Sequence, residues 1–222
     1  REYRAEAERM KTAIEKYFGA EVSGYETYRY YEGNDVLRSW ICLPLVVGLD
    51  YHREGTAAAL LGPEMMTRNG LLTAQGDSTF WDRSTLYALR GLFCAGYSDE
   101  AYAFMHDFSA WRLLGDHVPY MIEARPEGSQ RHLSAESGLY CRIVTEGIFG
   151  IRPTGLSSFT LTPSMPSSWG RMALRHIKAF GRDFDISVSR LPSGRLEVSV
   201  TGPGISPQRH TVLEGGTLKI VL

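Results

Sequence analysis

Apolar residues recur at helical spacing along most of the chain and then change to an alternating pattern. From Arg1 to about Gly150 they return every three or four residues, whereas from Ile151 to Leu222 they alternate with polar residues between Gly, Pro and Ser. The pattern predicts two domains, a segment of helical hairpins over 1–150 and an antiparallel β-domain over 151–222.

The helical part divides into six expected helices, at about residues 1–18, 35–51, 55–61, 80–94, 98–114 and 134–149. The first has one apolar stripe, formed by Tyr3, Ala7, Met10, Ile14, Tyr17 and Phe18. A polar, tyrosine-rich loop over 25–34 follows it. The run Trp40–Leu49 is apolar nearly all round, which is typical of a buried helix, and Pro44 should kink it. Asp77 or Ser78 can cap the helix over 80–94.

Helices that alternate between all-round apolar and amphipathic are typical of concentric inner and outer rings. The predicted fold class is therefore mainly α, a partial or complete (α/α)6 helical toroid followed by a small antiparallel β-sheet or sandwich. Only about three hairpins fit into 1–150, given a typical helix of about 11–12 residues. Because Trp40–Leu49 is too apolar to stay exposed, we expect the missing N-terminal part of the same polypeptide, or another chain, to complete the barrel.

The last third predicts five strands, at about residues 158–162, 172–180, 183–190, 195–201 and 217–222. Turn residues separate them at Gly181-Arg182, Pro192–Gly194 and Glu214–Gly216. Outward charges alternate with apolar residues along these strands, and catalytic residue types do not concentrate there. We assign this domain a supporting role.

Composition and charge exclude several classes of function. The 222 residues are 43% hydrophobic with a net charge of -1 and no basic run, so neither a nucleic acid nor a membrane surface is an expected partner. Cys42, Cys94 and Cys141 stand singly inside apolar patterns and are expected to be buried small residues. No His/Cys/Asp cluster has metal-ligand spacing and no Gly-rich phosphate loop follows a strand, so neither a metal nor another cofactor is expected. Nothing distinguishes a cytoplasmic location from a periplasmic or secreted one.

The stretch Tyr120–Gly138 is unusually rich in charged side chains and joins two expected helices. Carboxylates and guanidinium groups suit the hydroxyl groups of a sugar, so this stretch predicts a carbohydrate site. Its charged and titratable members are Glu123, Arg125, Glu127, Arg131, His132 and Glu136.

Four segments carry a resemblance to a known family. They are Trp40–Leu45, Thr79–Tyr97, Ile122–Gly128 and His132–Gly138, which resemble the C-terminal hairpins of (α/α)6 six-hairpin glycoside hydrolases, above all the trehalase and processing α-glucosidase group. The stretches Gly147–Pro153 and Phe159–Trp169 resemble the exit into a β-domain in α-L-rhamnosidases and disaccharide phosphorylases. The resemblance implies a carbohydrate substrate.

The same resemblance assigns a role to Glu123, which matches the position of the general base in trehalase-like enzymes. Such a base activates water on the sugar face opposite the leaving group. Inversion also needs a protonated carboxyl group about 6.5–9.5 Å away. In those relatives the acid lies well upstream, at a position that would precede Arg1. Either the acid is outside this chain, or Asp82, Asp77 or Glu136 has taken its role, and Asp82 is the candidate by proximity.

The remaining site candidates are expected to bind substrate. Trp81 and Arg83 lie at the mouth end of an expected inner helix, where they could stack on a sugar and donate hydrogen bonds to it, although Trp81 also suits a core position. The others are Tyr31, Glu32, Glu127, Arg131, His132 and Glu136.

The leading functional hypothesis is inverting hydrolysis of an α-glycosidic bond in a glucoside-like or rhamnoside-like substrate. One alternative is an inverting disaccharide phosphorylase, in which Arg131, His132 and Ser134 would hold phosphate. Another is a non-catalytic carbohydrate-binding or assembly fragment of a larger glycosidase. The sequence leaves the sugar, the anomer and the linkage open.

Overall fold

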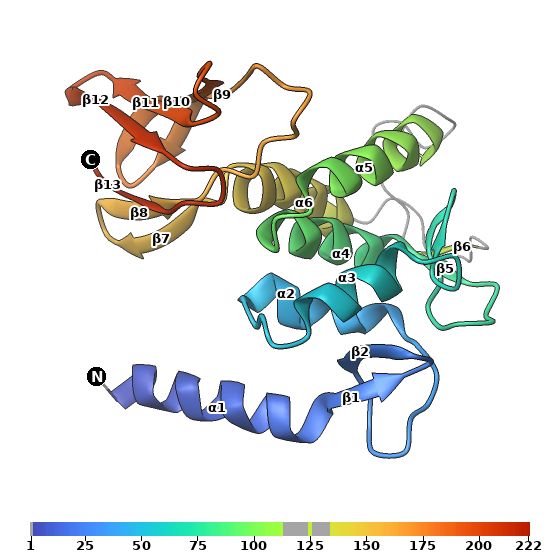
Figure 1. Cartoon of the computed structure of the whole chain (residues 1–222). Helices are drawn as coiled ribbons and strands as arrows, with labels where there is room; N and C mark the ends of the chain where they lie inside the picture. Colours follow the sequence, from blue (N-terminus) through green and yellow to red (C-terminus); the bar gives the residue numbers. More distant parts are fainter. Residues whose placement is uncertain (1, 113–123, 126–133) are drawn as a thin grey trace. The chain divides into compact units, whose positions relative to one another are not determined.

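The computed structural model describes residues 2–112, 124–125 and 134–222. The chain divides into two compact units, Arg1–Ile143 and Val144–Leu222. Figure 1 shows the first as helices with short hairpins and the second as two groups of strands.

The helical unit is built from short elements in the order helix, hairpin, helices and small two-stranded ladders. Its helices are α1 (Glu2–Phe18), the 3-10 turn η1 (Ser39–Cys42), α2 (Leu43–Val47), α3 (Arg53–Leu61), α4 (Asp82–Cys94), α5 (Ser98–Arg112) and α6 (Ser134–Arg142). Its strands are β1 (Gly19–Val22), β2 (Tyr25–Tyr28), β3 (Met66–Thr67), β4 (Gly70–Leu71), β5 (Phe80–Trp81) and β6 (Ala124–Arg125). A π-helical segment, η2 (Ile143–Ile148), continues α6 across the boundary between the units.

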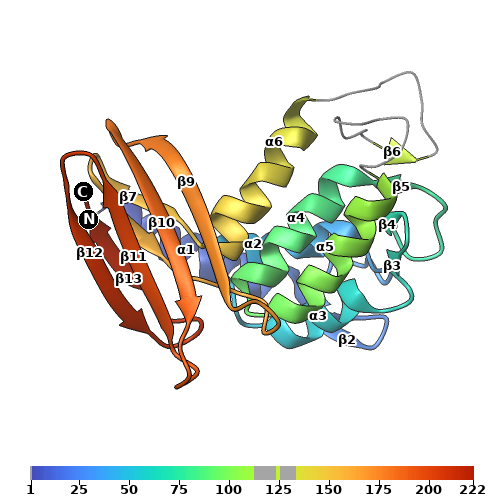
Figure 2. The ribbon, with the colours of Figure 1, turned by 90° about the horizontal axis from the view of Figure 1, so that it is seen from above.

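Helix α4 forms the centre of this unit, with α2, η1, α5 and α6 packed against it. Ten of its thirteen residues are buried, as its apolar positions Leu86, Leu89, Leu92 and Phe93 require. Gly91 allows the close approach of α2, because a Cβ atom there would lie 3.0 Å from the Cβ of Leu45. Figures 1 and 2 show α4 and α5 running side by side.

The helix expected over 35–51 is much shorter than predicted. Only η1 and the five-residue α2 form, and Gly48, at φ 75° in the left-handed region, ends α2. Pro44 falls in the first turn of α2, where its missing N–H group is not needed, and so it helps to start a helix instead of kinking one. The segment is also only partly buried, since Leu43 and Val47 are exposed.

The loop expected over 25–34 contains a strand that pairs with the preceding one. Strands β1 and β2 form an antiparallel hairpin, and Ser23 and Gly24, both at positive φ, make its two-residue turn. Helix α3 packs on β2, where the hydroxyl groups of Thr27 and Thr56 share a buried hydrogen bond of 2.8 Å. A Ser-Gly pair between two short segments is a recognised signal for a β-hairpin. The prediction of a loop over 25–34 did not use this signal.

The β unit contains two antiparallel sheets. One has the order β12-β11-β10-β9, from β9 (Arg171–Ala179), β10 (Arg182–Arg190), β11 (Leu196–Gly202) and β12 (Ile205–Val212). The other has the order β13-β8-β7, from β7 (Arg152–Gly155), β8 (Ser158–Leu161) and β13 (Leu218–Val221). Figure 2 shows the four longer strands side by side. Inward-facing Phe159 stacks on Phe184 at 5.8 Å between ring centroids, and this contact joins the two sheets in one core.

The predicted fold class is wrong. The described residues are 39% helical and 31% strand, and they form six α-helices with several small antiparallel sheets, which is not a mainly helical (α/α)6 toroid. The helical periodicity is real in α1, α4 and α5, but β1 to β6 interrupt it. The alternation of all-round apolar and amphipathic segments therefore did not indicate concentric rings.

Only one of the three cysteines fits the expectation of a buried small residue. Cys42 is fully buried, and desolvation by burial raises the pKa of its thiol to about 12. Cys94 and Cys141 are exposed. Each stands at the end of its helix, where apolar neighbours in the sequence do not guarantee burial.

Gly150 is a position where the β unit requires glycine. Its φ is 63°, and a Cβ atom there would lie 2.2 Å from the carbonyl oxygen of Thr162. We expect Gly150→Ala to lower the free energy of unfolding of the β unit by about 2 kcal/mol, because left-handed strain adds to the clash. Gly170→Ala is the matched control, since no atom lies within 4 Å of its added Cβ. Denaturant unfolding should separate the two, and equal stabilities would contradict the prediction.

Candidate functional site

The candidate site lies at the N-terminal end of α4. Trp81 precedes the helix in an extended conformation, with φ -108° and ψ 119°, and makes no side-chain cap. The hydroxyl groups of Ser84 and Thr85 donate instead to the carbonyl oxygen of Trp81, at 3.1 and 3.0 Å. These bonds fix the orientation of the Trp81-Asp82-Arg83 segment relative to the first turn of the helix.

A short antiparallel ladder brings a distant segment to the same place. Strand β5 pairs with β6, with Phe80 opposite Arg125 and Trp81 opposite Ala124. Ala124 directly follows Glu123 in the sequence. The ladder therefore joins the start of α4 to the charged stretch that the sequence singled out.

An ion pair joins the start of α4 to the first turn of α6. Arg83 Nε donates to Glu136 Oε1 at 2.7 Å. The Glu136 side chain is fully buried, whereas that of Arg83 is 39% exposed. Glu136 Oε2 is also buried and has no hydrogen-bond partner among the residues that the structure describes. The pair thus joins a partly exposed arginine side chain to a buried carboxylate.

A second ion pair lies next to the first and is almost completely buried. Arg112 Nη2, from the end of α5, donates to Asp82 Oδ1 at 2.5 Å, and both side chains are at most 3% exposed. The guanidinium group stabilises the ionised form of the Asp82 carboxylate, whereas a general acid must carry a proton. The geometry therefore favours a structural role for Asp82 over the role of acid.

Aromatic rings gather at Trp81, beside the start of α4. Trp40 meets Trp81 edge-on at 5.9 Å between centroids, and it also meets Tyr87 at 6.1 Å. The Arg90 guanidinium lies 5.2 Å from the centre of the Tyr87 ring. All three rings are only partly buried. Partly exposed rings beside guanidinium and carboxylate groups can stack on the apolar face of a sugar while the charged groups bind its hydroxyls.

Other predicted candidates lie elsewhere. Tyr31 and Glu32 are exposed in the turn after β2, and among the described residues they make no hydrogen bond or ring contact with the cluster at α4. Asp77 does not cap α4, because β5 intervenes. Its carboxylate accepts hydrogen bonds from the Thr73 hydroxyl and, at 2.7 Å, from the Ser78 amide. The Thr73 hydroxyl is the main cause of the lowered pKa of Asp77, which disfavours a proton-donor role.

Four predicted site residues lie outside the described part of the chain. They are Glu123, Glu127, Arg131 and His132. The structure therefore brings together Trp81, Asp82, Arg83 and Glu136 from the predicted set.

Sequence reasoning missed Arg112 and the ring of Trp40. Arg112 follows Ala101, Phe104 and Phe108 on the buried face of α5 at intervals of three or four residues. An arginine at such a position needs a buried partner, and that signal was available in the sequence. Trp40 begins an apolar run, which predicted only that its side chain is buried and not that its ring contacts Trp81.

No group of His, Cys, Asp and Glu in the described ranges could hold a metal ion. None of the helices of those ranges is both long and apolar enough to cross a membrane.

The comparisons with known proteins add no relative. No protein-family model matches the chain, and no curated protein does so at a significant level. Together with six helices and 31% strand, this contradicts the resemblance to the six-hairpin glycosidases.

Proposed function

We propose that this chain hydrolyses glycosidic bonds with inversion at a site formed by the N-terminal end of α4. One observation carries the proposal: three separate segments of the chain meet there. They are Trp81–Arg83, the β6 pair Ala124–Arg125, and Glu136. This convergence gathers an aromatic ring, a guanidinium group and a carboxylate, which is the chemistry that recognises a sugar ring.

In this proposal the described residues bind and orient the sugar. Trp81 stacks on the ring, and Arg83 donates to ring or hydroxyl oxygens while Glu136 holds it in place at 2.7 Å. A guanidinium group anchored on a buried carboxylate loses little freedom when it binds, so it positions substrate precisely. The buried Asp82–Arg112 ion pair attaches the Trp81–Arg83 segment to the end of α5.

The proposal takes Glu123 as the general base, because its neighbour Ala124 pairs with Trp81. In this role the Glu123 carboxylate would remove a proton from the attacking water on the face opposite the leaving group. Asp82 and Asp77 are not the proton donor in this proposal, since the Asp82 carboxylate is buried in an ion pair with Arg112 and the Thr73 hydroxyl lowers the pKa of Asp77.

The test is incubation of the chain with 4-nitrophenyl α-glucoside and α-rhamnoside, followed by proton NMR of the first sugar released. We expect the β anomer, because single displacement inverts the anomeric centre. Absence of turnover on both substrates, binding without turnover, or first release of the α anomer would overturn the proposal. A parallel reaction with inorganic phosphate should give no sugar phosphate. Formation of one would show phosphorolysis and contradict hydrolysis.

A further inference from the structure

Helix α1 is the least covered element of the helical unit. None of its seventeen residues is buried, and its main neighbour is β1, which follows it directly in the chain. A single helix of this length is only marginally stable in water without tertiary packing. Hydrogen bonds attach its C-terminal end, where the Tyr28 hydroxyl and His52 contact Glu15 and Arg29 donates to the carbonyl of Tyr17. Its N-terminal half has no such attachment among the described residues.

The exposed side of α1 carries a heptad pattern. Its apolar residues alternate at intervals of four and three, in the order Tyr3, Ala7, Met10, Ile14 and Tyr17. This spacing defines the a and d positions of a two-stranded coiled coil, with Ala7 and Ile14 at a. Tyr3 is 90% exposed, and Met10 and Tyr17 are also exposed. Ile14 is half-buried and the Arg29 guanidinium lies 5.3 Å from the centre of the Tyr17 ring, so this unit leaves the apolar seam open mainly over Tyr3, Ala7 and Met10.

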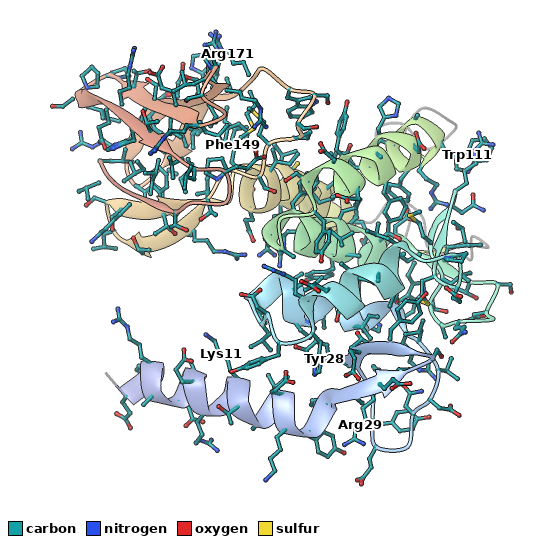
Figure 3. All side chains as sticks on the ribbon, in the orientation of Figure 1. Lys11, Tyr28, Arg29, Trp111, Phe149 and Arg171 are labelled. Atoms are coloured by element: carbon teal, nitrogen blue, oxygen red, sulfur yellow. The ribbon has the colours of Figure 1, made fainter. Side chains whose placement is uncertain are left out.

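An apolar groove adjoins this seam. It has a volume of about 570 Å³, and Ile14 and Phe18 of α1 line one wall while Leu43, Pro44 and Val47 of α2 line the other. Val47 is 64% exposed. Tyr28 of β2, which also lines this groove, is labelled in Figure 3 together with Lys11 of α1. A helix that packed along the seam would also reach the exposed residues of α2.

The charged residues beside the seam indicate which helix packs on it. In the heptad numbering Glu6 takes position g and Lys11 the following position e, which are the two positions that face each other between parallel helices. A second copy of α1 in parallel register would place each Glu6 opposite the partner's Lys11, twice in a symmetric pair. In an antiparallel pair the basic e positions, Arg4 and Lys11, would face each other and repel.

We propose that two copies of this chain associate through α1 as a parallel, two-fold symmetric helix pair, with the exposed residues of α2 extending the interface. The inference does not depend on the proposed function. It assigns the uncovered apolar seam to self-association, which is consistent with both its heptad spacing and its charge order.

Sedimentation of the full chain over a range of concentrations tests the proposal. We expect a concentration-dependent dimer at twice the mass of one chain, and a Met10→Glu variant whose dissociation constant rises at least 100-fold, because it would bury two charges at the seam. Far-UV circular dichroism should show that this variant keeps its fold. A chain that stays monomeric up to about millimolar concentration, or a dimer that Met10→Glu leaves unchanged, would overturn the proposal.

Charge exchange tests the register independently. Glu6→Lys or Lys11→Glu alone should each raise the dissociation constant about tenfold, since two attractions become two repulsions. The double variant Glu6→Lys/Lys11→Glu should restore the original value. Lys16→Glu is the matched control, because it makes the same charge change at position c, away from the seam. Equal effects of Lys11→Glu and Lys16→Glu, or no restoration in the double variant, would contradict the parallel pairing.

Discussion

Replacing Arg112 by Met should lower the free energy of unfolding of the helical unit by about 3–5 kcal/mol. The Asp82 carboxylate is 1% exposed, and Arg112 Nη2 donates to it at 2.5 Å. Removing the guanidinium leaves a buried negative charge without this cation, and the protein interior solvates such a charge poorly. Denaturant unfolding followed by far-UV circular dichroism measures the loss, because the described helices α1 to α6 belong to this unit.

The exposed pair Arg9–Glu6 offers a matched control for this prediction. It has the same 2.5 Å separation, but the Arg9 side chain is 72% exposed. Arg9→Met should therefore leave the free energy of unfolding of the helical unit nearly unchanged. The double variant Asp82→Asn/Arg112→Met should recover part of the loss, because it removes both charges together. A loss below about 1 kcal/mol for Arg112→Met would show that the pair contributes little to folding.

Changing Glu123 to Gln should lower kcat about 10²–10⁴-fold in the hydrolysis of the substrate that the chain accepts. The amide keeps the size of the side chain but cannot take a proton from water. KM should change little, since binding rests on Trp81, Arg83 and Glu136 in the proposed site. Steady-state kinetics on the 4-nitrophenyl glycosides separates the two quantities.

Glu21→Gln provides the comparison for Glu123→Gln, because Glu21 is an exposed residue of β1 and lies in the hairpin next to α1. It should leave kcat within about twofold. Unfolding curves of both variants should match that of the parent chain. If Glu123→Gln keeps kcat within a few-fold, Glu123 is not the base. If hydrolysis is lost together with stability, the defect lies in folding.

Local sequence patterns predicted the elements that owe their form to near neighbours. The expected helix over 1–18 is α1, and those over 80–94 and 98–114 contain α4 and the described part of α5. Three strands expected over 172–201 correspond to β9, β10 and β11, and the turn at Gly181 falls between β9 and β10 as predicted. In these segments the spacing of apolar residues and the turn residues agree with each other.

The failures occur where local patterns allowed two outcomes. The apolar run Trp40–Leu49 suits a long buried helix, but Gly48 stops α2 and only part of the run is covered. Strands β7 and β12 were missed because β7 carries Pro153 and β12 carries Pro207, residues that argue against a strand. Pro tolerates such positions at sheet edges, where no neighbouring strand needs its N–H group, and both strands are edge strands.

The candidate site depended on contacts that spacing alone does not reveal. Trp81, Asp82 and Arg83 could be selected from the sequence, because they stand at the start of an apolar helix in a segment that carried the family resemblance. Their partners could not, because Arg112 and Glu136 reach them across long separations in the chain. Only the packing of α5 and α6 on α4 decides that these charges meet.

The three cysteine thiols differ in their accessibility to a chemical reagent. A thiol-specific reagent reaches Cys94 and Cys141 at the surface, whereas Cys42 lies in the packed interface of η1 with α4 and keeps its proton. Because the thiolate is the reactive species, modification of Cys42 has to wait until that interface opens. The rate at which Cys42 is modified therefore measures how fast this interface opens. The measurement needs no introduced label.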